Sequence, residues 1–118
     1  LVVDLPSSPT IARGDIAARA SEMLRDAGLD ESPDMVVGDF NCTPSSVVFD
    51  AVAPGLRAAP PWCSAGWLCT YRRPWPMLRI DAMLVAPTLE WRGYRTVDLA
   101  LGEHRAQQGI VRPVQPKR

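Results

Sequence analysis

The sequence predicts an α/β fold on three observations. Two short apolar runs, Leu1–Leu5 and Met35–Val37, flank a segment whose apolar residues recur at helical spacing. A later segment, Ile80–Val85, alternates in the manner of a strand and stops before a proline. The chain has 118 residues, 47% of them hydrophobic, and a formal net charge of +0. These values suit one packed domain and exclude a protein that holds nucleic acid by bulk electrostatics.

The first half of the chain reads as a strand, a helix and a second strand. Pro6 ends the strand expected at Leu1–Leu5, and Gly28 is a natural stop for a helix that begins near Asp15. The apolar face of this helix comprises Ile16, Ala20, Met23, Leu24 and Ala27. Because this order is that of a crossover unit, Leu1–Leu5 and Met35–Val37 are expected to be parallel neighbours.

The second half is expected to hold one short helix and several strands. Ser45 or Ser46 can cap a helix that carries Val47, Val48 and Val52. The stretch from Pro60 to Pro76 is rich in proline and tryptophan, which predicts a long loop around one brief strand. The expected strands are Leu68–Tyr71, Ile80–Val85 with Trp91–Asp98 as its partner, and Gly109–Val111. We expect one domain over residues 1–112 and a flexible polar tail over 113–118.

The first candidate site residues are in Gly38-Asp39-Phe40-Asn41, directly after the strand Met35–Val37. Side chains that follow the carboxyl end of a strand project into the crevice where open sheets bind ligands. Asp39 offers hard oxygen to a divalent cation or accepts a proton from water, and Asn41 offers an amide donor to a phosphate oxygen. A capped turn is the alternative interpretation of this tetrapeptide.

Two further motifs add charged groups. Arg79-Ile80-Asp81 places an acid at the start of an otherwise apolar strand, and Gly102-Glu103-His104 contains the only histidine of the chain. A lone histidine usually serves packing or lies on the surface, but this one lies in a loop between a carboxylate and an arginine.

In this order the three motifs resemble those of the endonuclease/exonuclease/phosphatase family, the DNase I-like metal-dependent phosphoesterases. The family carries Gly-Asp-Phe-Asn, Arg-Ile-Asp and Ser-Asp-His, and this chain has Gly102-Glu103-His104 in place of the third. The resemblance extends from Leu1 to about Val111. It implies the C-terminal half of a four-layer α/β sandwich with a mixed β-sheet.

The resemblance also implies roles for individual residues. Asp39 would orient or deprotonate the attacking water, and Asn41 would hold a non-bridging phosphate oxygen. His104 would donate to the phosphate or act as acid and base, held by Asp81 in a carboxylate–imidazole pair. Glu103 and Asp39 would hold a divalent metal, Mg²⁺ or Mn²⁺. The full-length protein would then be a hydrolase of phosphodiesters or phosphomonoesters, nuclease-like in its chemistry.

Three departures from the family pattern favour a second hypothesis, a catalytically silent binding or structural module. No segment of the chain can stand for the family's N-terminal half, which supplies an asparagine and a metal-binding glutamate. Asp4 stands where the family's strand often ends in histidine, and Glu103 is one methylene longer than the family's aspartate. A generic α/β domain whose motifs arose by chance is a third hypothesis.

Arg72, Arg73 and Trp75 lie in the long loop and are candidate substrate contacts, since arginines interleaved with aromatic residues can track phosphates. The three cysteines lack a Cys-x-x-Cys pair, which argues against a zinc site.

The expected partners are a phosphate ester and the missing N-terminal half. The ester could be a nucleic acid, an inositol phosphate or a phospholipid head group, and the sequence does not choose among them. It also leaves open the oligomeric state and whether the protein is cytoplasmic or lies outside the cytoplasm behind an upstream membrane segment.

Overall fold

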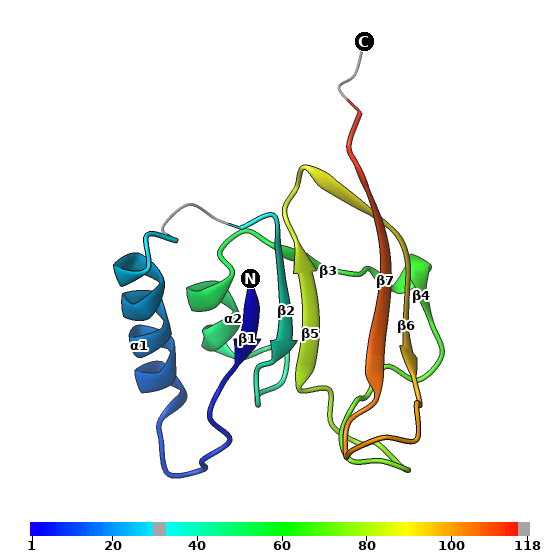
Figure 1. Cartoon of the computed structure of the whole chain (residues 1–118), viewed down its shortest axis with the longest axis horizontal. Helices are drawn as coiled ribbons and strands as arrows, with labels where there is room; N and C mark the ends of the chain where they lie inside the picture. The colour runs from blue at the N-terminus through cyan, green and yellow to red at the C-terminus, as the bar shows by residue number, and fades with distance from the viewer. Residues whose placement is uncertain (30–32, 116–118) are drawn as a thin grey trace.

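The computed structural model describes residues 1–29 and 33–115, which form two small sheets and two α-helices (Figure 1). The first sheet has the strand order β1-β2-β5-β3, and the second has the order β4-β6-β7. Both sheets contain parallel and antiparallel pairs, so the fold is mixed α/β as the sequence predicts. The strands are β1 (Val2–Asp4), β2 (Met35–Asp39), β3 (Arg57–Ala58), β4 (Ser64–Ala65), β5 (Asp81–Val85), β6 (Leu89–Val97) and β7 (Ala106–Pro113).

The expected crossover is confirmed. Helix α1 (Arg13–Asp26) connects β1 to β2, and these two strands pair in parallel. Gly28 ends the helix at a φ of +66°, a backbone conformation that favours glycine, and its N–H donates to the carbonyl of Arg25. Part of the expected connection after this helix, residues 30–32, lies outside the described residues.

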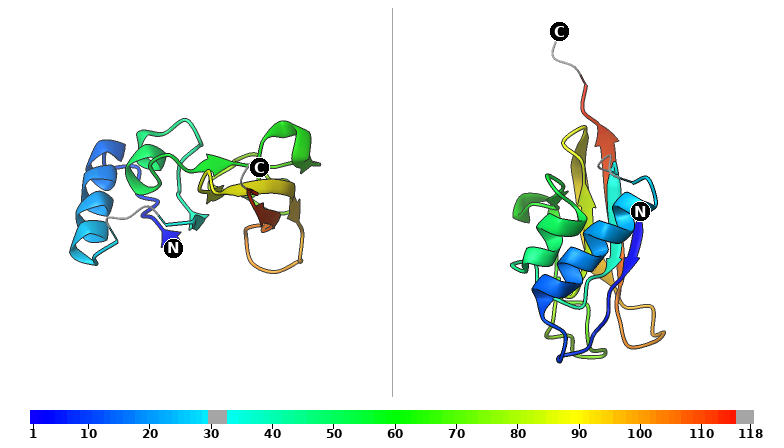
Figure 2. Two further views of the ribbon diagram at one scale, coloured as in Figure 1. Left: turned by 90° about the horizontal axis from the view of Figure 1, so that it is seen from above. Right: turned by 90° about the vertical axis from the view of Figure 1, so that its left-hand side faces the viewer.

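Helix α2 (Val47–Val52) begins as the sequence predicts, with Ser46 as its cap. The Ser46 Oγ accepts a hydrogen bond from the N–H of Val48. The two helices cover one face of the first sheet (Figures 1 and 2). In this core Phe40 stacks on Phe49, with ring centroids 4.2 Å apart. The other buried residues of the core are Ile16, Ala17, Val36, Cys42, Val48, Val52, Ala53, Ala82 and Leu84.

The second sheet corrects two expectations. Strand β6 pairs with β7 and β4, whereas β5 pairs with β2 and β3, so the two strands expected to be partners belong to different sheets. The brief strand expected at Leu68–Tyr71 is also wrong, because only Tyr71 forms isolated bridges there. The long loop instead carries β3, β4 and a 3₁₀ turn, η1 (Pro61–Cys63).

The two sheets meet at Gly109 of β7. A Cβ atom there would lie 2.7 Å from the Trp91 ring and 3.1 Å from the Met83 side chain of β5. Trp91 anchors the second, smaller core with Ala59, Val85 and Tyr94. Strand β7 extends through Pro113, one residue into the expected tail, and the Val114 N–H donates to the Thr88 carbonyl. The last three residues of the expected flexible tail, 116–118, lie outside the described residues.

Neither α1 nor α2, nor any other helix in the described part of the chain, is long and apolar enough to cross a bilayer. The three cysteines, Cys42, Cys63 and Cys69, are all free thiols.

Candidate functional site

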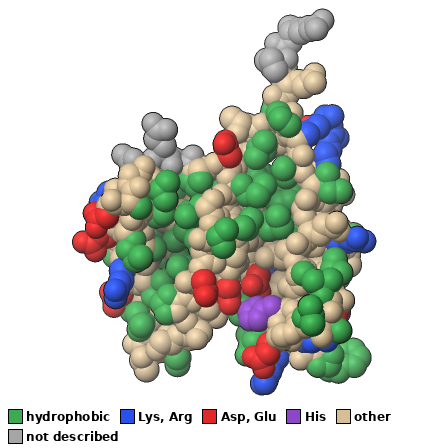
Figure 3. All heavy atoms as spheres, in the orientation of Figure 1, with side chains coloured by type: hydrophobic (Ala, Val, Ile, Leu, Met, Phe, Trp, Pro, Cys, Tyr) green, Lys and Arg blue, Asp and Glu red, His purple; other side chains and the backbone are tan. Residues whose placement is uncertain are grey.

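Three aspartates lie side by side across the first sheet. Asp39 ends β2 and is in register with Asp4, which ends β1, and with Asp81, which begins β5. Residues in register on neighbouring strands point to the same face, so the three carboxylates form one acidic row. Figure 3 shows acidic side chains gathered beside the histidine, below a hydrophobic area of the same face.

Gly38 makes this row possible by allowing β1 and β2 to approach closely. Its φ is +142°, and a Cβ atom built on it would lie 1.9 Å from the carbonyl oxygen of Val3. A side chain at this position would therefore push β1 away from β2. The glycine of the Gly38-Asp39-Phe40-Asn41 motif thus allows the two strands to pack closely. This packing places Asp39 beside Asp4.

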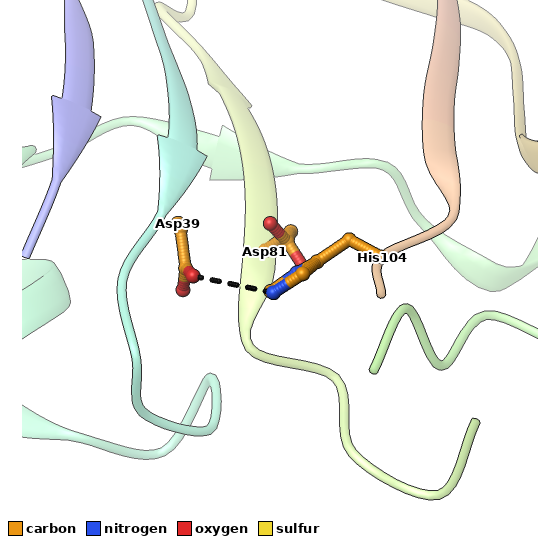
Figure 4. A group of neighbouring side chains, drawn as sticks. All are labelled: Asp39, Asp81 and His104. Atoms are coloured by element: carbon orange, nitrogen blue, oxygen red, sulfur yellow. Dashed lines mark hydrogen bonds and ion pairs between the residues drawn. The ribbon is translucent and has the colours of Figure 1, made fainter. Parts of the chain in front are cut away.

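His104 completes the candidate site from the loop between β6 and β7. Its Nδ1 lies 2.8 Å from Oδ2 of Asp81, and its Nε2 lies 3.8 Å from Oδ2 of Asp39 (Figure 4). The Asp81 side chain is 13% exposed and that of His104 is 35% exposed. The imidazole therefore reaches solvent, whereas the carboxylate that it contacts is largely buried. The predicted pairing of Asp81 with His104 is present in the structure.

The pKa of the Asp39 carboxyl is shifted by its burial and by several neighbouring groups. Burial raises the pKa of the Asp39 carboxyl above its usual value, and the negative charge of Asp81 adds to this effect. A hydrogen bond from the N–H of Asn41 to Oδ1, 2.7 Å long, lowers the pKa in part, as does the nearby His104. The net shift is upward, so the folded protein disfavours the ionised form of Asp39.

Asn41 and Glu103, the other predicted site residues, have partners of their own. Asn41 adopts a φ of +47°, and its Nδ2 donates to the carbonyl of Leu5 over 2.6 Å, which ties the motif to the end of β1. Oε1 of Glu103 lies 2.6 Å from Nη2 of Arg72, and Glu103 is not among the residues whose ligand atoms converge. The structure thus brings together Asp39, Asp81 and His104 and places Glu103 outside this group.

The predicted substrate contacts lie in the short hairpin 71–78, which is closed by a bridge between Tyr71 and Leu78. Tyr71 also bridges to His104, so this hairpin lies beside the loop that carries the histidine. Arg72 is largely exposed and bound to Glu103, whereas the Arg73 side chain is 20% exposed and paired with Asp98. Trp75 is 83% exposed at the hairpin tip.

Sequence reasoning missed three residues that lie near His104 or Asp81. The Tyr71 ring lies 4.9 Å from the His104 ring, and Thr70, completely buried, accepts the N–H of Arg105 at its carbonyl oxygen. Tyr94 is buried, and this burial raises the pKa of its phenol, an effect partly offset by Arg79. The strand alternation could have placed Tyr94 in the core, but no sequence signal links Thr70 to the site.

The donor set at this site fits a divalent cation. One ligand atom from each of Asp39, Asp81 and His104 lies within 4.8 Å of the others. Carboxylate oxygens suit Mg²⁺ and Mn²⁺, and Mn²⁺ also accepts an imidazole nitrogen. A bound cation would relieve the repulsion between the ionised aspartates.

The site thus combines a carboxylate–histidine pair with a second carboxylate, that of Asp39, at the end of a mixed sheet. No protein-family model matches the sequence, and no curated protein matches it. Solved structures do match, and the chain spans about half the length of each.

A conserved protein of unknown function from Enterococcus faecalis superposes with a TM-score of 0.71 at 18% identity, over 96% of this chain and 49% of that one. A mannosyl-6-phosphatase from Bacteroides thetaiotaomicron gives 0.66 at 18% identity, over 93% and 49%. An endonuclease/exonuclease/phosphatase from Bacteroides vulgatus gives 0.62 at 19% identity, over 86% and 44%. The chain therefore has the fold of about half of an endonuclease/exonuclease/phosphatase protein, consistent with the C-terminal half.

Proposed function

We propose that the chain supplies the C-terminal half of the active site of a divalent-metal-dependent phosphoesterase. The observation that carries this proposal is the convergence of His104 on Asp81 and Asp39, from three elements that are far apart in sequence. The names of the solved structures with this fold support hydrolysis of phosphate esters as the class of reaction.

Each residue has a role that its position supports. Asp81 accepts a hydrogen bond from Nδ1 of His104, which orients the ring and stabilises a positive charge on it. Nε2 then faces the space beside Asp39, where it can donate a proton to a phosphate oxygen or to the leaving group. Asp39 can accept a hydrogen bond from the attacking water, and the second N–H of the Asn41 amide can donate to a non-bridging oxygen.

Asp39 and Asp81 are the proposed carboxylate ligands of Mg²⁺ or Mn²⁺. When bound, the cation would neutralise charge that develops on the phosphoryl group. Glu103 is a proposed ligand only if its ion pair with Arg72 opens. Arg72 and Trp75 stay proposed substrate contacts, and the substrate itself stays a phosphate ester of open class.

We further propose that an N-terminal half of the fold completes the protein. Two observations support this: the chain covers about half of the solved structures, and Val2 on the open face of the first sheet is 78% exposed. A buried position for this valine in a longer protein would remove apolar surface from water.

A catalytically silent module is the second candidate. The ion pair between Glu103 and Arg72 and the presence of Asp4 at the end of β1 favour it, because they alter two positions that the family uses for chemistry.

The test is hydrolysis of bis(4-nitrophenyl) phosphate by the full-length protein with Mn²⁺ or Mg²⁺. Asp39→Ala and His104→Ala should each lower kcat by about 10²- to 10⁴-fold without loss of the folded state, because each removes a group that acts on the reacting atoms. Near-normal activity in either variant would refute its role. Absence of both turnover and Mn²⁺ binding, in a folded wild-type sample, would favour the silent module.

A further inference from the structure

The position of His104 depends on a loop, because the residue lies in no strand. It follows the segment 98–103 between β6 and β7, and it pairs with Tyr71 through an isolated bridge. The aspartates that it faces are fixed by strand register, but the histidine needs another support to stay within reach of them.

Arg73 supplies that support through three hydrogen bonds to the same loop. Its Nε donates to Oδ1 of Asp98 over 2.6 Å, and its Nη1 donates to the carbonyl of Gly102 over 2.9 Å. Its main-chain N–H donates to the carbonyl of Glu103 over 2.8 Å. The last of these bonds ends on the residue directly before His104.

The loop requires such support at Ala100, which adopts a φ of +55°, a strained backbone conformation for a non-glycine residue. Gly102 adopts +60°, which glycine tolerates without strain. Oδ1 of Asp98 accepts the N–H of Ala100 as well as the Nε–H of Arg73, so one carboxylate oxygen links the turn to the guanidinium. The planar guanidinium can serve Asp98 and Gly102 together, which a lysine ammonium on a flexible stem cannot reproduce.

We infer that Arg73 is a positioning residue, whose guanidinium holds the loop 98–102 so that the imidazole of His104 lies between Asp81 and Asp39. This inference rests on the proposed phosphoesterase function. It differs from the interpretation of Arg73 as a substrate contact, because its guanidinium donors are directed at the protein's own loop. Arg72 differs, since its guanidinium makes one exposed ion pair.

Steady-state kinetics on the full-length protein separate the two roles. Arg73→Lys and Arg73→Gln should lower kcat by about 10- to 100-fold for bis(4-nitrophenyl) phosphate, with KM changed by less than about twofold, because a displaced general acid slows chemistry without weakening binding. A raised KM at unchanged kcat would overturn the inference and restore the substrate contact. The matched control is Arg112→Gln, which breaks an arginine–carboxylate pair with Glu90 at the opposite end of the β6–β7 hairpin and should leave both constants unchanged.

An NMR measurement tests the inference whether or not the protein is active. The imidazole nitrogens are observed in protein labelled with ¹⁵N-histidine, and the His104 signals are assigned by their loss in His104→Gln. Arg73→Lys should shift or broaden these signals, and Arg112→Gln should leave them unchanged. If Arg73→Gln does not fold, Asp98→Ala removes the acceptor of the Arg73 Nε–H from the other side. Unchanged imidazole signals in folded Arg73→Lys and Asp98→Ala would refute the inference. A folded wild-type protein with neither turnover nor Mn²⁺ binding would overturn the proposed function alone.

Discussion

Replacement of Gly38 by alanine should be among the most damaging small substitutions in the chain. The new Cβ would lie 1.9 Å from the Val3 carbonyl oxygen, whereas ordinary contacts begin near 3.4 Å. Strands β1 and β2 would have to separate by about 1.5 Å at this point, at a φ of +142° that an alanine rarely adopts. Backbone strain and overpacking together predict a loss of about 3 kcal/mol or more.

Chemical denaturation followed by circular dichroism measures this loss, and Gly14→Ala is the matched control. Gly14 lies in α1, and a Cβ atom at this position would have nothing within 4 Å, so alanine should stabilise the helix by up to about 1 kcal/mol. A separation of β1 from β2 would also displace the neighbouring Asp39, a proposed Mn²⁺ ligand, so Mn²⁺ binding by any folded Gly38→Ala protein should weaken. Equal unfolding free energies for Gly38→Ala and the wild type would show that β1 and β2 do not approach as described.

Three further predictions concern stability, measured by thermal or chemical denaturation, and in one case also the KM of the phosphodiester assay. The raised pKa of Asp39 means that its ionisation opposes folding: this cost is absent below the ordinary value of 3.8 and grows as the pH rises through the folded-state pKa. Asp39→Asn should therefore raise Tm at pH 7 and lose this advantage near pH 3; an equal gain at both pH values would contradict the shift. Phe40→Ala removes a completely buried ring and should cost about 3–5 kcal/mol in denaturation, whereas Trp75→Ala should change stability by less than about 0.5 kcal/mol. Arg72→Ala should cost less than about 1 kcal/mol, because its ion pair is exposed, and should raise KM in the phosphodiester assay if the side chain contacts substrate.

The sequence was sufficient to predict the elements whose patterns are local. Gly28 and Ser46 mark helix ends by their own conformational and hydrogen-bonding preferences, so both helices were found close to their observed bounds. The parallel pairing of β1 with β2 followed from their connection by one helix, which leaves few arrangements open.

The pairing of the later strands could not be predicted in the same way. Residues 91–98 have the alternation of a strand, but alternation does not say which neighbour a strand takes. The partner is decided by tertiary packing. Gly109 has no side chain, which lets β7 pack against Trp91 and Met83, and β6 pairs with β7 in a second sheet instead of continuing the first.

The same distinction explains what the sequence told us about the candidate site. Asp39 and Asp81 are placed side by side by strand register, but the expected partner of Ile80–Val85 was a different strand, so only the resemblance of the motifs implied that the two aspartates share a site. Glu103 and His104 belong to a loop whose shape is set by Arg73, some thirty residues earlier in the chain, and no local pattern encodes that hydrogen bonding. The longer side chain of glutamate at position 103 then extends to Arg72 rather than to the aspartates, and the Thr70–Arg73 segment thus holds both residues of the motif. Adjacent residues of one motif therefore have different partners here: His104 joins the acidic row, and Glu103 stabilises the hairpin that supports it.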